Sequence, residues 1–122
     1  MKKILIVDDS AFMRSILKDL LSKNEQPVEI FEAEGKITAS EQLKKHIPDL
    51  VLLDVVMKEN QFEGIEVLKE IKEFYPNTKV IMLTSVGQVA IVEECKKLGA
   101  EHYIEKPFDQ DMVLERVNHY LL

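Results

Sequence analysis

The chain has 122 residues, a length at which one domain can bury a core and two cannot. Its net charge of −6 argues against a nucleic-acid-binding surface, which needs clustered Lys and Arg. No apolar run reaches the length of about 18 residues that spans a membrane, and the first run is too short for a signal peptide. The single cysteine, Cys95, excludes an internal disulfide, so we expect a cytoplasmic protein.

Five short apolar runs, taken in chain order, predict five strands. They lie at 4–7, 28–33, 50–53, 80–83 and 103–104. The first, third and fourth runs are continuous and rich in Ile, Val and Leu, which is typical of strands buried on both faces of a parallel sheet. The second run alternates more between apolar and polar residues, which favours an edge strand.

Stretches with helical periodicity follow each of these runs. Apolar residues recur at helical spacing within 13–21, 39–47, 67–75, 91–98 and 113–121. We expect Ser10 to cap the first helix, Pro76 to end the third and Gly99 to end the fourth. We also expect Phe12 and Phe108 to wedge helices against the sheet.

Strand and helix therefore alternate five times along the chain. This alternation implies right-handed crossovers and a central parallel sheet with helices on both faces. We found no linker, repeat or low-complexity segment in the sequence. The sequence thus predicts one doubly wound α/β domain over residues 1–122.

Polar residues stand at the carboxyl ends of four predicted strands, where ligands bind in folds of this kind. Asp8 and Asp9 follow the first run, Asp54 the third, Thr84 the fourth and Lys106 the fifth. Three clustered carboxylates need a cation, and Mg²⁺ or Mn²⁺ suits such oxygen ligands. The ammonium and the hydroxyl would cradle an anion. Taken singly, each residue has a simpler explanation as a turn, a helix cap or a surface lysine, but together they indicate a phosphoryl site.

The segments ILIVDDS, DLVLLDVVM, VIMLTS and HYIEKPF resemble those of response-regulator receiver domains, in the family's order and across the whole chain. The resemblance implies a flavodoxin-like (βα)5 fold with five parallel strands in the order 2-1-3-4-5. It also implies a phosphorylation-dependent switch of a two-component system that accepts a phosphoryl group from a histidine kinase. Such a protein is not an enzyme in the usual sense, because it promotes only its own phosphorylation and dephosphorylation.

The resemblance assigns a role to each residue at the strand ends. It implies that Asp54 is the phosphoryl acceptor, that Asp9 binds Mg²⁺ directly and that Asp8 acts through water. The backbone carbonyl of Val56 would be a further metal ligand. Lys106 would pair with the phosphoryl oxygens, and its bond to the following proline would be cis.

The same resemblance implies a switch made of Thr84 and Tyr103. The threonine would move to hydrogen-bond the phosphoryl oxygens, and the tyrosine would rotate inward behind it. The partner surface would be the face formed by the fourth helix, the fifth strand and the fifth helix, next to the tyrosine.

Two shorter segments, DDSAFMR and SVGQ, are similar to those of stand-alone chemotaxis regulators. They favour a monomeric protein that binds a downstream target such as a component of the flagellar motor switch. The alternative is a single-domain receiver outside chemotaxis that acts in a phosphorelay.

The sequence departs from the family pattern next to the acceptor. The family reads Asp-x-x-Met-Pro-x-x-Asp-Gly, whereas here VVMKENQFE separates the aspartate from the glycine, which is two residues longer. Lys58 stands where the proline would be, and Glu63 where the last aspartate would be. Val56 and Val86 occupy the positions that in the family help to place the attacking water. Because both are apolar, we expect slow loss of the phosphoryl group.

Three other kinds of protein are alternatives to a phosphorylation-dependent switch. A flavin-binding electron carrier of the same topology would need a Ser/Thr/Gly phosphate loop after the first strand, where this chain has two acids. An aspartate-nucleophile phosphatase would carry a DxD pattern after that strand, and a cap domain. A degenerate receiver that only binds partners would not need all five residues at the strand ends.

Overall fold

A computed structural model describes residues 1–55, 57, 63–85 and 87–121 of the chain. Strands and helices alternate as predicted: β1 (Lys2–Val7), α1 (Ala11–Leu21), β2 (Val28–Ala33), α2 (Lys36–His46), β3 (Leu50–Asp54), α3 (Glu63–Phe74), β4 (Lys79–Thr84), α4 (Val89–Lys97), β5 (His102–Glu105) and α5 (Gln110–Leu121). None of the described helices combines the length and the apolar character that a membrane span requires.

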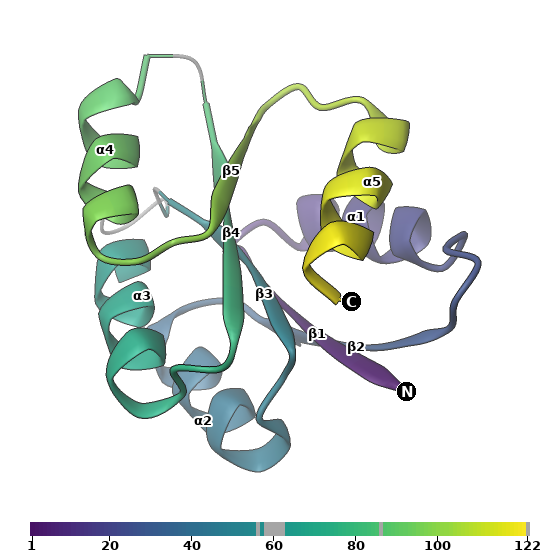
Figure 1. Cartoon of the computed structure of the whole chain (residues 1–122), viewed down its shortest axis with the longest axis horizontal. Coiled ribbons are helices and arrows are strands. Elements are labelled where there is room, and N and C mark those ends of the chain that lie inside the picture. Colours follow the sequence, from purple (N-terminus) through teal and green to yellow (C-terminus); the bar gives the residue numbers. More distant parts are fainter. Residues whose placement is uncertain (56, 58–62, 86, 122) are drawn as a thin grey trace.

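The five strands form one parallel sheet in the order β2-β1-β3-β4-β5, which confirms the predicted topology (Figure 1). The register aligns the carboxyl ends of the strands. Val7 lies opposite both Ala33 and Leu53, Asp54 lies opposite Leu83, and Thr84 lies opposite Glu105. The polar residues that follow the strands therefore meet at one edge, as the sequence predicted.

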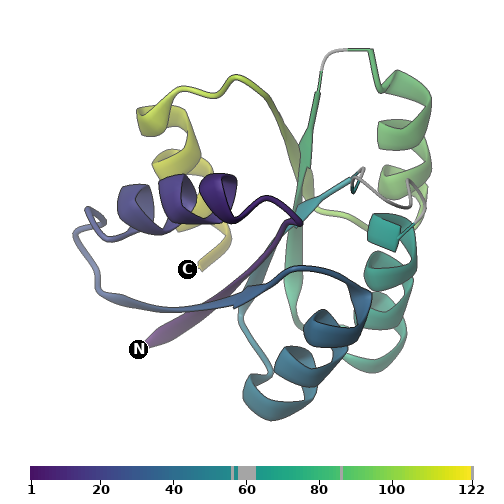
Figure 2. The same ribbon diagram turned by 180° about the vertical axis from the view of Figure 1, so that it is seen from behind.

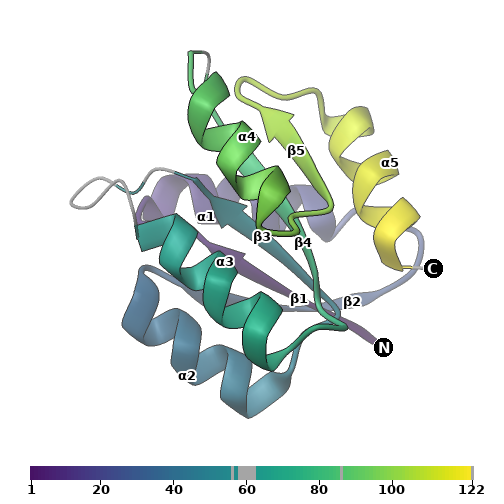
Figure 3. The same cartoon turned by 60° about the vertical axis from the view of Figure 1, so that its left-hand side comes forward.

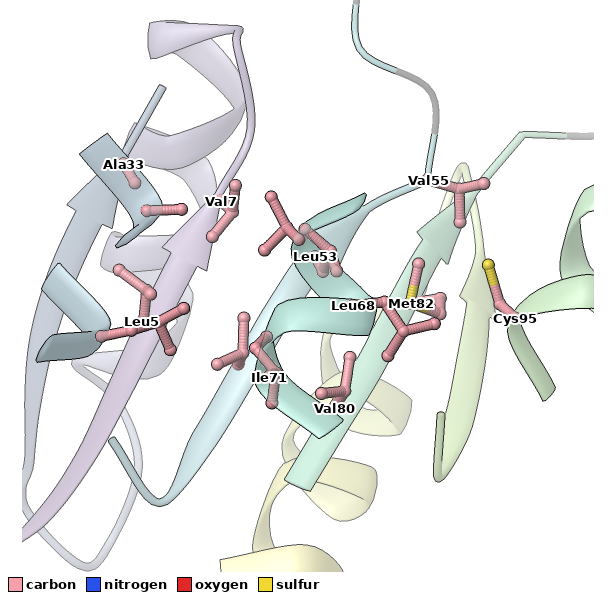
Figure 4. Packing of buried hydrophobic residues seen from close by; sticks show 14 of the residues in the cluster. Leu5, Val7, Ala33, Leu53, Val55, Leu68, Ile71, Val80, Met82 and Cys95 are labelled. Carbon is pink, nitrogen blue, oxygen red and sulfur yellow. The ribbon is translucent and has the colours of Figure 1, made fainter. Parts of the chain in front are cut away.

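Alternation along the strands builds two separate cores. Leu5 and Val7 of β1 pack with α2, α3 and α4, whereas Ile4 and Ile6 pack with α1 and α5. Figure 1 shows α2, α3 and α4 on one side of the sheet and α1 and α5 on the opposite side. Figure 2 shows the same layers from behind. Figure 3 shows α2 and α3 side by side, and Figure 4 shows side chains of the core beneath them. All five residues of β3 are buried, which explains why its sequence reads as a continuous apolar run.

The predicted helix boundaries are confirmed. The Ser10 hydroxyl accepts a hydrogen bond from the Met13 amide at 3.2 Å, so it caps α1. Helix α3 ends at Phe74, two residues before Pro76. Gly99 follows the last turn of α4 with a φ of 106°, a left-handed conformation that glycine adopts without strain.

One packing prediction was wrong. Phe12 is 74% exposed and wedges nothing, because it lies about 140° around the α1 axis from the buried Leu17. Phe108 is half-buried against the core under α1 and α5, as predicted. Two residues of the predicted apolar stretches are also exposed, Phe74 at 66% and Ile47 at 63%. Ile47 ends α2 in the left-handed region, at a φ of 45°, and so leaves the apolar face of that helix.

Candidate functional site

Asp8 occupies the position directly after β1 and is buried, with 1% exposure. Its Oδ1 accepts a hydrogen bond from the Ser10 amide at 2.9 Å. Its Oδ2 has no hydrogen-bond partner among the described residues, and the nearest recorded cation is the Lys106 ammonium at 3.6 Å. A buried carboxylate oxygen without a hydrogen bond is costly, so this oxygen is available to a ligand.

Asp54 is the last residue of β3 and is 7% exposed. The Lys106 ammonium lies 3.6 Å from its Oδ1, which is the same distance as to Asp8. Lys106 follows β5, and its amide donates to the Thr84 carbonyl at 2.7 Å, so the strand pairing itself positions this lysine. The peptide bond between Lys106 and Pro107 is cis, as the resemblance implied.

Asp8, Asp9 and Asp54 each offer a carboxylate oxygen within 4.8 Å of the others. Asp9 is the least buried of the three. The Lys106 ammonium lies within 4 Å of two of these acids, and the hard oxygen donors of the cluster suit a divalent cation such as Mg²⁺. The unpartnered Oδ2 of Asp8 fits the same requirement. This acidic cluster could therefore bind a metal ion, whereas the predicted ligand Val56 lies outside the described residues.

The start of α3 packs directly over the end of β3. A Cβ atom at Gly64 would come within 2.5 Å of the carbonyl oxygens of Asp54 and Val55, so only glycine allows this approach. Glu63 is the first residue of α3, but its side chain contacts another helix: its Oε1 accepts a hydrogen bond from the Lys36 amide at 2.6 Å. It thereby caps the N-terminus of α2, a role that the family pattern at this position did not indicate.

Thr84 ends β4 and is buried, with 2% exposure. Its hydroxyl donates a hydrogen bond to the Oε1 of Gln88 at 2.9 Å. Thr84, Gln88 and Tyr103 line the same small cavity of about 90 Å³. The Lys96 ammonium lies 4.7 Å from the centroid of the Tyr103 ring. The structure thus brings the two predicted switch residues to one cavity.

Arg14 is a residue of the site that sequence reasoning missed. Its guanidinium donates to the Asp8 carbonyl oxygen at 2.6 Å and pairs with Glu32 at 3.1 Å. These contacts tie α1 and β2 to the backbone of the acidic cluster. The sequence signal was weak, because an arginine in the first turn of a helix more often faces solvent.

Fold and site together define an α/β protein with an acidic cluster and a lysine at the carboxyl ends of its strands. The family model for the response regulator receiver domain matches residues 4–118. Among curated relatives, the chemotaxis protein CheY of Bacillus subtilis is 46% identical over 116 residues, which cover 95% of this chain and 94% of the relative. Sporulation initiation phosphotransferase F of the same organism is 39% identical over 120 residues, covering 98% and 94%. The solved receiver domain of NtrX from Brucella abortus superimposes with a TM-score of 0.88 at 28% identity, covering 97% of both chains.

The chain belongs to the response-regulator receiver family. It is the receiver domain of a two-component response regulator, and proteins of this class are signalling switches rather than enzymes in the usual sense. Family membership decides against the flavin carrier and the phosphatase among the alternatives weighed from the sequence.

Proposed function

We propose that Asp54 accepts a phosphoryl group from a histidine kinase, and that residues 1–122 act as one receiver domain. The observation that supports this most directly is the convergence of Asp8, Asp54 and Lys106 around the Asp8 Oδ2, which has no hydrogen bond among the described residues. Asp8, Asp9, Asp54 and the backbone carbonyl of Val56 would hold Mg²⁺, with Mn²⁺ as a substitute. A bound divalent cation would supply positive charge that lets a phosphoryl group approach the acids.

The proposed reaction is an in-line transfer. A carboxylate oxygen of Asp54 attacks the phosphorus of the kinase phosphohistidine, the P–N bond breaks and the imidazole leaves. Such a transfer needs positioning and charge stabilisation more than a strong base. The Lys106 ammonium is 3.6 Å from the attacking carboxylate and would pair with the phosphoryl oxygens once the transfer is complete.

Phosphorylation would then act through Thr84 and Tyr103. A complete shift from 1:99 to 99:1 needs about 5.5 kcal/mol of differential stabilisation. One new neutral hydrogen bond contributes about 1 kcal/mol, which is far too little. The response is therefore a partial population shift or a cooperative rearrangement that includes more than the Thr84 hydroxyl.

Incubation with a small-molecule phosphodonor and Mg²⁺, followed by intact mass, tests the acceptor. We expect one added phosphoryl group on the wild type and none on Asp54→Asn, which keeps the side-chain shape but removes the nucleophilic carboxylate. Omitting Mg²⁺ should strongly reduce the modification. An unmodified wild-type chain under these conditions would instead favour a degenerate receiver that only binds partners.

We further propose that the output lies in chemotaxis, with a component of the flagellar motor switch as downstream target. The similarity to the chemotaxis protein CheY of Bacillus subtilis supports this proposal. The alternative, a phosphorelay outside chemotaxis, is supported by the similarity to sporulation initiation phosphotransferase F. Phosphorylation-dependent binding to a switch component favours the first, and phosphoryl transfer onward to a histidine of a second protein favours the second.

The face formed by α4, β5 and α5 is the proposed partner surface, because Tyr103 lies on it and shares a cavity with Thr84. We expect Tyr103→Ala to weaken phosphorylation-dependent binding while Asp54 still accepts the phosphoryl group. Unchanged dependence on phosphorylation in that variant would place the switch elsewhere. We propose that the protein acts as a cytoplasmic monomer, which sedimentation of both phosphorylation states would test.

A further inference from the structure

The side chain of Gln88 reaches back from the start of α4 to the end of β4. Its Oε1 accepts two hydrogen bonds, from the Thr84 hydroxyl at 2.9 Å and from the Ser85 amide at 2.8 Å. Gln88 holds the N-cap position of α4, yet its side chain makes no capping hydrogen bond to that helix. The Gln88 side chain is therefore hydrogen-bonded to the end of β4 and not to α4.

The residue directly before Gln88 is a glycine in a special backbone conformation. Gly87 has a φ of 92°, a left-handed conformation that side-chain-bearing residues rarely adopt. A Cβ atom there would meet no atom of the described residues within 4 Å, so glycine is needed for the backbone conformation and not for space. The backbone carbonyl of Gln88 accepts the first hydrogen bond of α4, from the Val92 amide at 3.0 Å. One residue thus contacts both the switch threonine and the first turn of the helix.

The hydrogen bond to Gln88 uses the Thr84 hydroxyl proton, which the proposed switch would donate to a phosphoryl oxygen. A threonine hydroxyl carries one hydrogen and can donate fully to one acceptor. Among the described residues, its acceptors are the Gln88 amide oxygen at 2.9 Å and the Ser85 carbonyl at 3.2 Å. Because Thr84 is only 2% exposed, water does not readily replace a lost partner. Donation to a phosphoryl oxygen on Asp54 therefore requires that the bond to Gln88 break.

We propose that Gln88 is a positioning residue that holds Thr84 in the resting orientation and links its release to the start of α4. This inference rests on the proposed function, because it assumes that the Thr84 hydroxyl is needed at a phosphorylated Asp54. The amide oxygen competes with the phosphoryl group for the same proton. When Thr84 leaves, the Gln88 Oε1 loses one of the two hydrogen bonds described above, directly before the first residue of α4 and thus next to the proposed partner surface.

Two substitutions separate the amide oxygen from the bulk of the side chain. Gln88→Met keeps the length but removes the acceptor, whereas Gln88→Glu keeps an acceptor oxygen. The measurement is the apparent affinity for fluoroberyllate, a stable phosphoryl mimic, in the presence of Mg²⁺ by calorimetry. We expect Gln88→Met to bind it about threefold to tenfold more tightly, the effect of removing one competing hydrogen bond, and Gln88→Glu to bind no more tightly than the wild type.

A second background tests whether Gln88 acts through the threonine. In Thr84→Val there is no hydroxyl to hold, so adding Gln88→Met should leave the fluoroberyllate affinity of that variant unchanged. An equal gain with and without the Thr84 hydroxyl would overturn the proposal, because the substitution would then act by another route. An unchanged affinity on replacing Gln88 by Met in the wild-type background would also overturn it.

Amide hydrogen exchange at Ser85 in the free protein gives a readout that does not depend on phosphorylation. Exchange should be faster in Gln88→Met than in the wild type, and near the wild-type rate in Gln88→Glu. If the wild type neither binds fluoroberyllate nor gains mass, the proposed function fails. If Ser85 exchange is the same in all three proteins, the hydrogen bonds of Gln88 do not hold this strand end in solution and the inference itself fails.

Discussion

Acidic residues stand at both ends of the sheet, but their contacts differ between the two ends. At the amino ends of the strands, Asp49 accepts a hydrogen bond from the Lys3 amide at 2.8 Å. Glu101 accepts from the Val80 amide at 2.6 Å and pairs with the Lys72 ammonium at 2.7 Å. At the carboxyl ends, one oxygen of Asp8 has no hydrogen bond among the described residues, and its lysine is 3.6 Å away.

The contrast lies in what each carboxylate contacts. Carboxylates at the amino ends meet backbone N–H groups that the strands leave unpaired, so each satisfies a group that needs an acceptor. At the carboxyl ends, Asp8, Asp9 and Asp54 place carboxylate oxygens within 4.8 Å of one another, and a cation would reduce the repulsion between them. The amino-end acids should therefore contribute to stability, and the carboxyl-end acids should reduce it until a ligand binds.

The largest expected effect is a loss of stability when an acid at the amino ends of the strands is removed. Glu101→Ala removes the acceptor of the Val80 amide and the counter-charge of the half-buried Lys72 ammonium, which keeps a hydrogen bond to the Thr78 carbonyl at 3.3 Å. We therefore expect a loss of roughly 2–3 kcal/mol in the free energy of unfolding. Urea unfolding at neutral pH measures it. Glu29→Ala, which removes an exposed acid from the edge strand, is the matched control and should cost far less. Similar losses in both variants would remove the distinction between the two kinds of acid.

Removing an acid at the carboxyl ends of the strands should instead raise the stability of the protein. Without a divalent cation, Asp9→Ala or Asp54→Asn should raise the free energy of unfolding by about 1 kcal/mol, because each removes one of three neighbouring negative charges. Mg²⁺ should stabilise the wild type by mass action and stabilise Asp9→Ala much less. Melting temperatures with and without Mg²⁺ test both statements. An equal response of wild type and Asp9→Ala to Mg²⁺ would contradict the assignment of Asp9 as a ligand.

A kinetic prediction concerns the residues next to Asp54 and rests on the sequence alone, since Val56 and Val86 lie outside the described residues. Neither side chain can orient a water molecule, so the phosphoryl group should persist longer than in relatives with polar residues at both positions. Val56→Asn should shorten its lifetime about threefold, measured as decay of the phosphorylated protein after the donor is removed. A lifetime that is unchanged or longer would show that Val56 is not the limiting feature.

The smallest expected effect lies at the start of β5. Burial lowers the pKa of His102, and the positive charges of Arg116, Lys96 and His119 lower it further. The unfolded chain therefore binds a proton near the ordinary histidine pKa, whereas the folded chain does so only at lower pH. Stability should fall as the pH drops below about 6.5, and His102→Gln should flatten this part of the profile. The urea midpoint at several pH values between 5 and 8 measures it, and parallel profiles would contradict the expected role.

Local sequence patterns predicted the order of strands and helices and named the residues that stand at the strand ends, whereas the strand order followed from the family resemblance. Apolar runs, helical periodicity and residues such as Ser10, Pro76 and Gly99 act locally, so they can be interpreted without knowing what packs on them. The position of a residue at a strand end is also local. This is why Asp8, Asp54, Thr84 and Lys106 could be named before their distances were known.

Only the tertiary structure decided which partner each polar side chain takes. Glu63 caps a helix that begins 27 residues earlier, Arg14 reaches the backbone of Asp8, and the Gln88 side chain turns back toward Thr84 instead of capping α4. Phe12 faces solvent although its neighbours form an apolar stripe. Such outcomes depend on how closely elements distant in sequence approach one another. A few ångströms of packing decide whether a carboxylate meets an amide, a lysine or another carboxylate, and no local pattern encodes that distance.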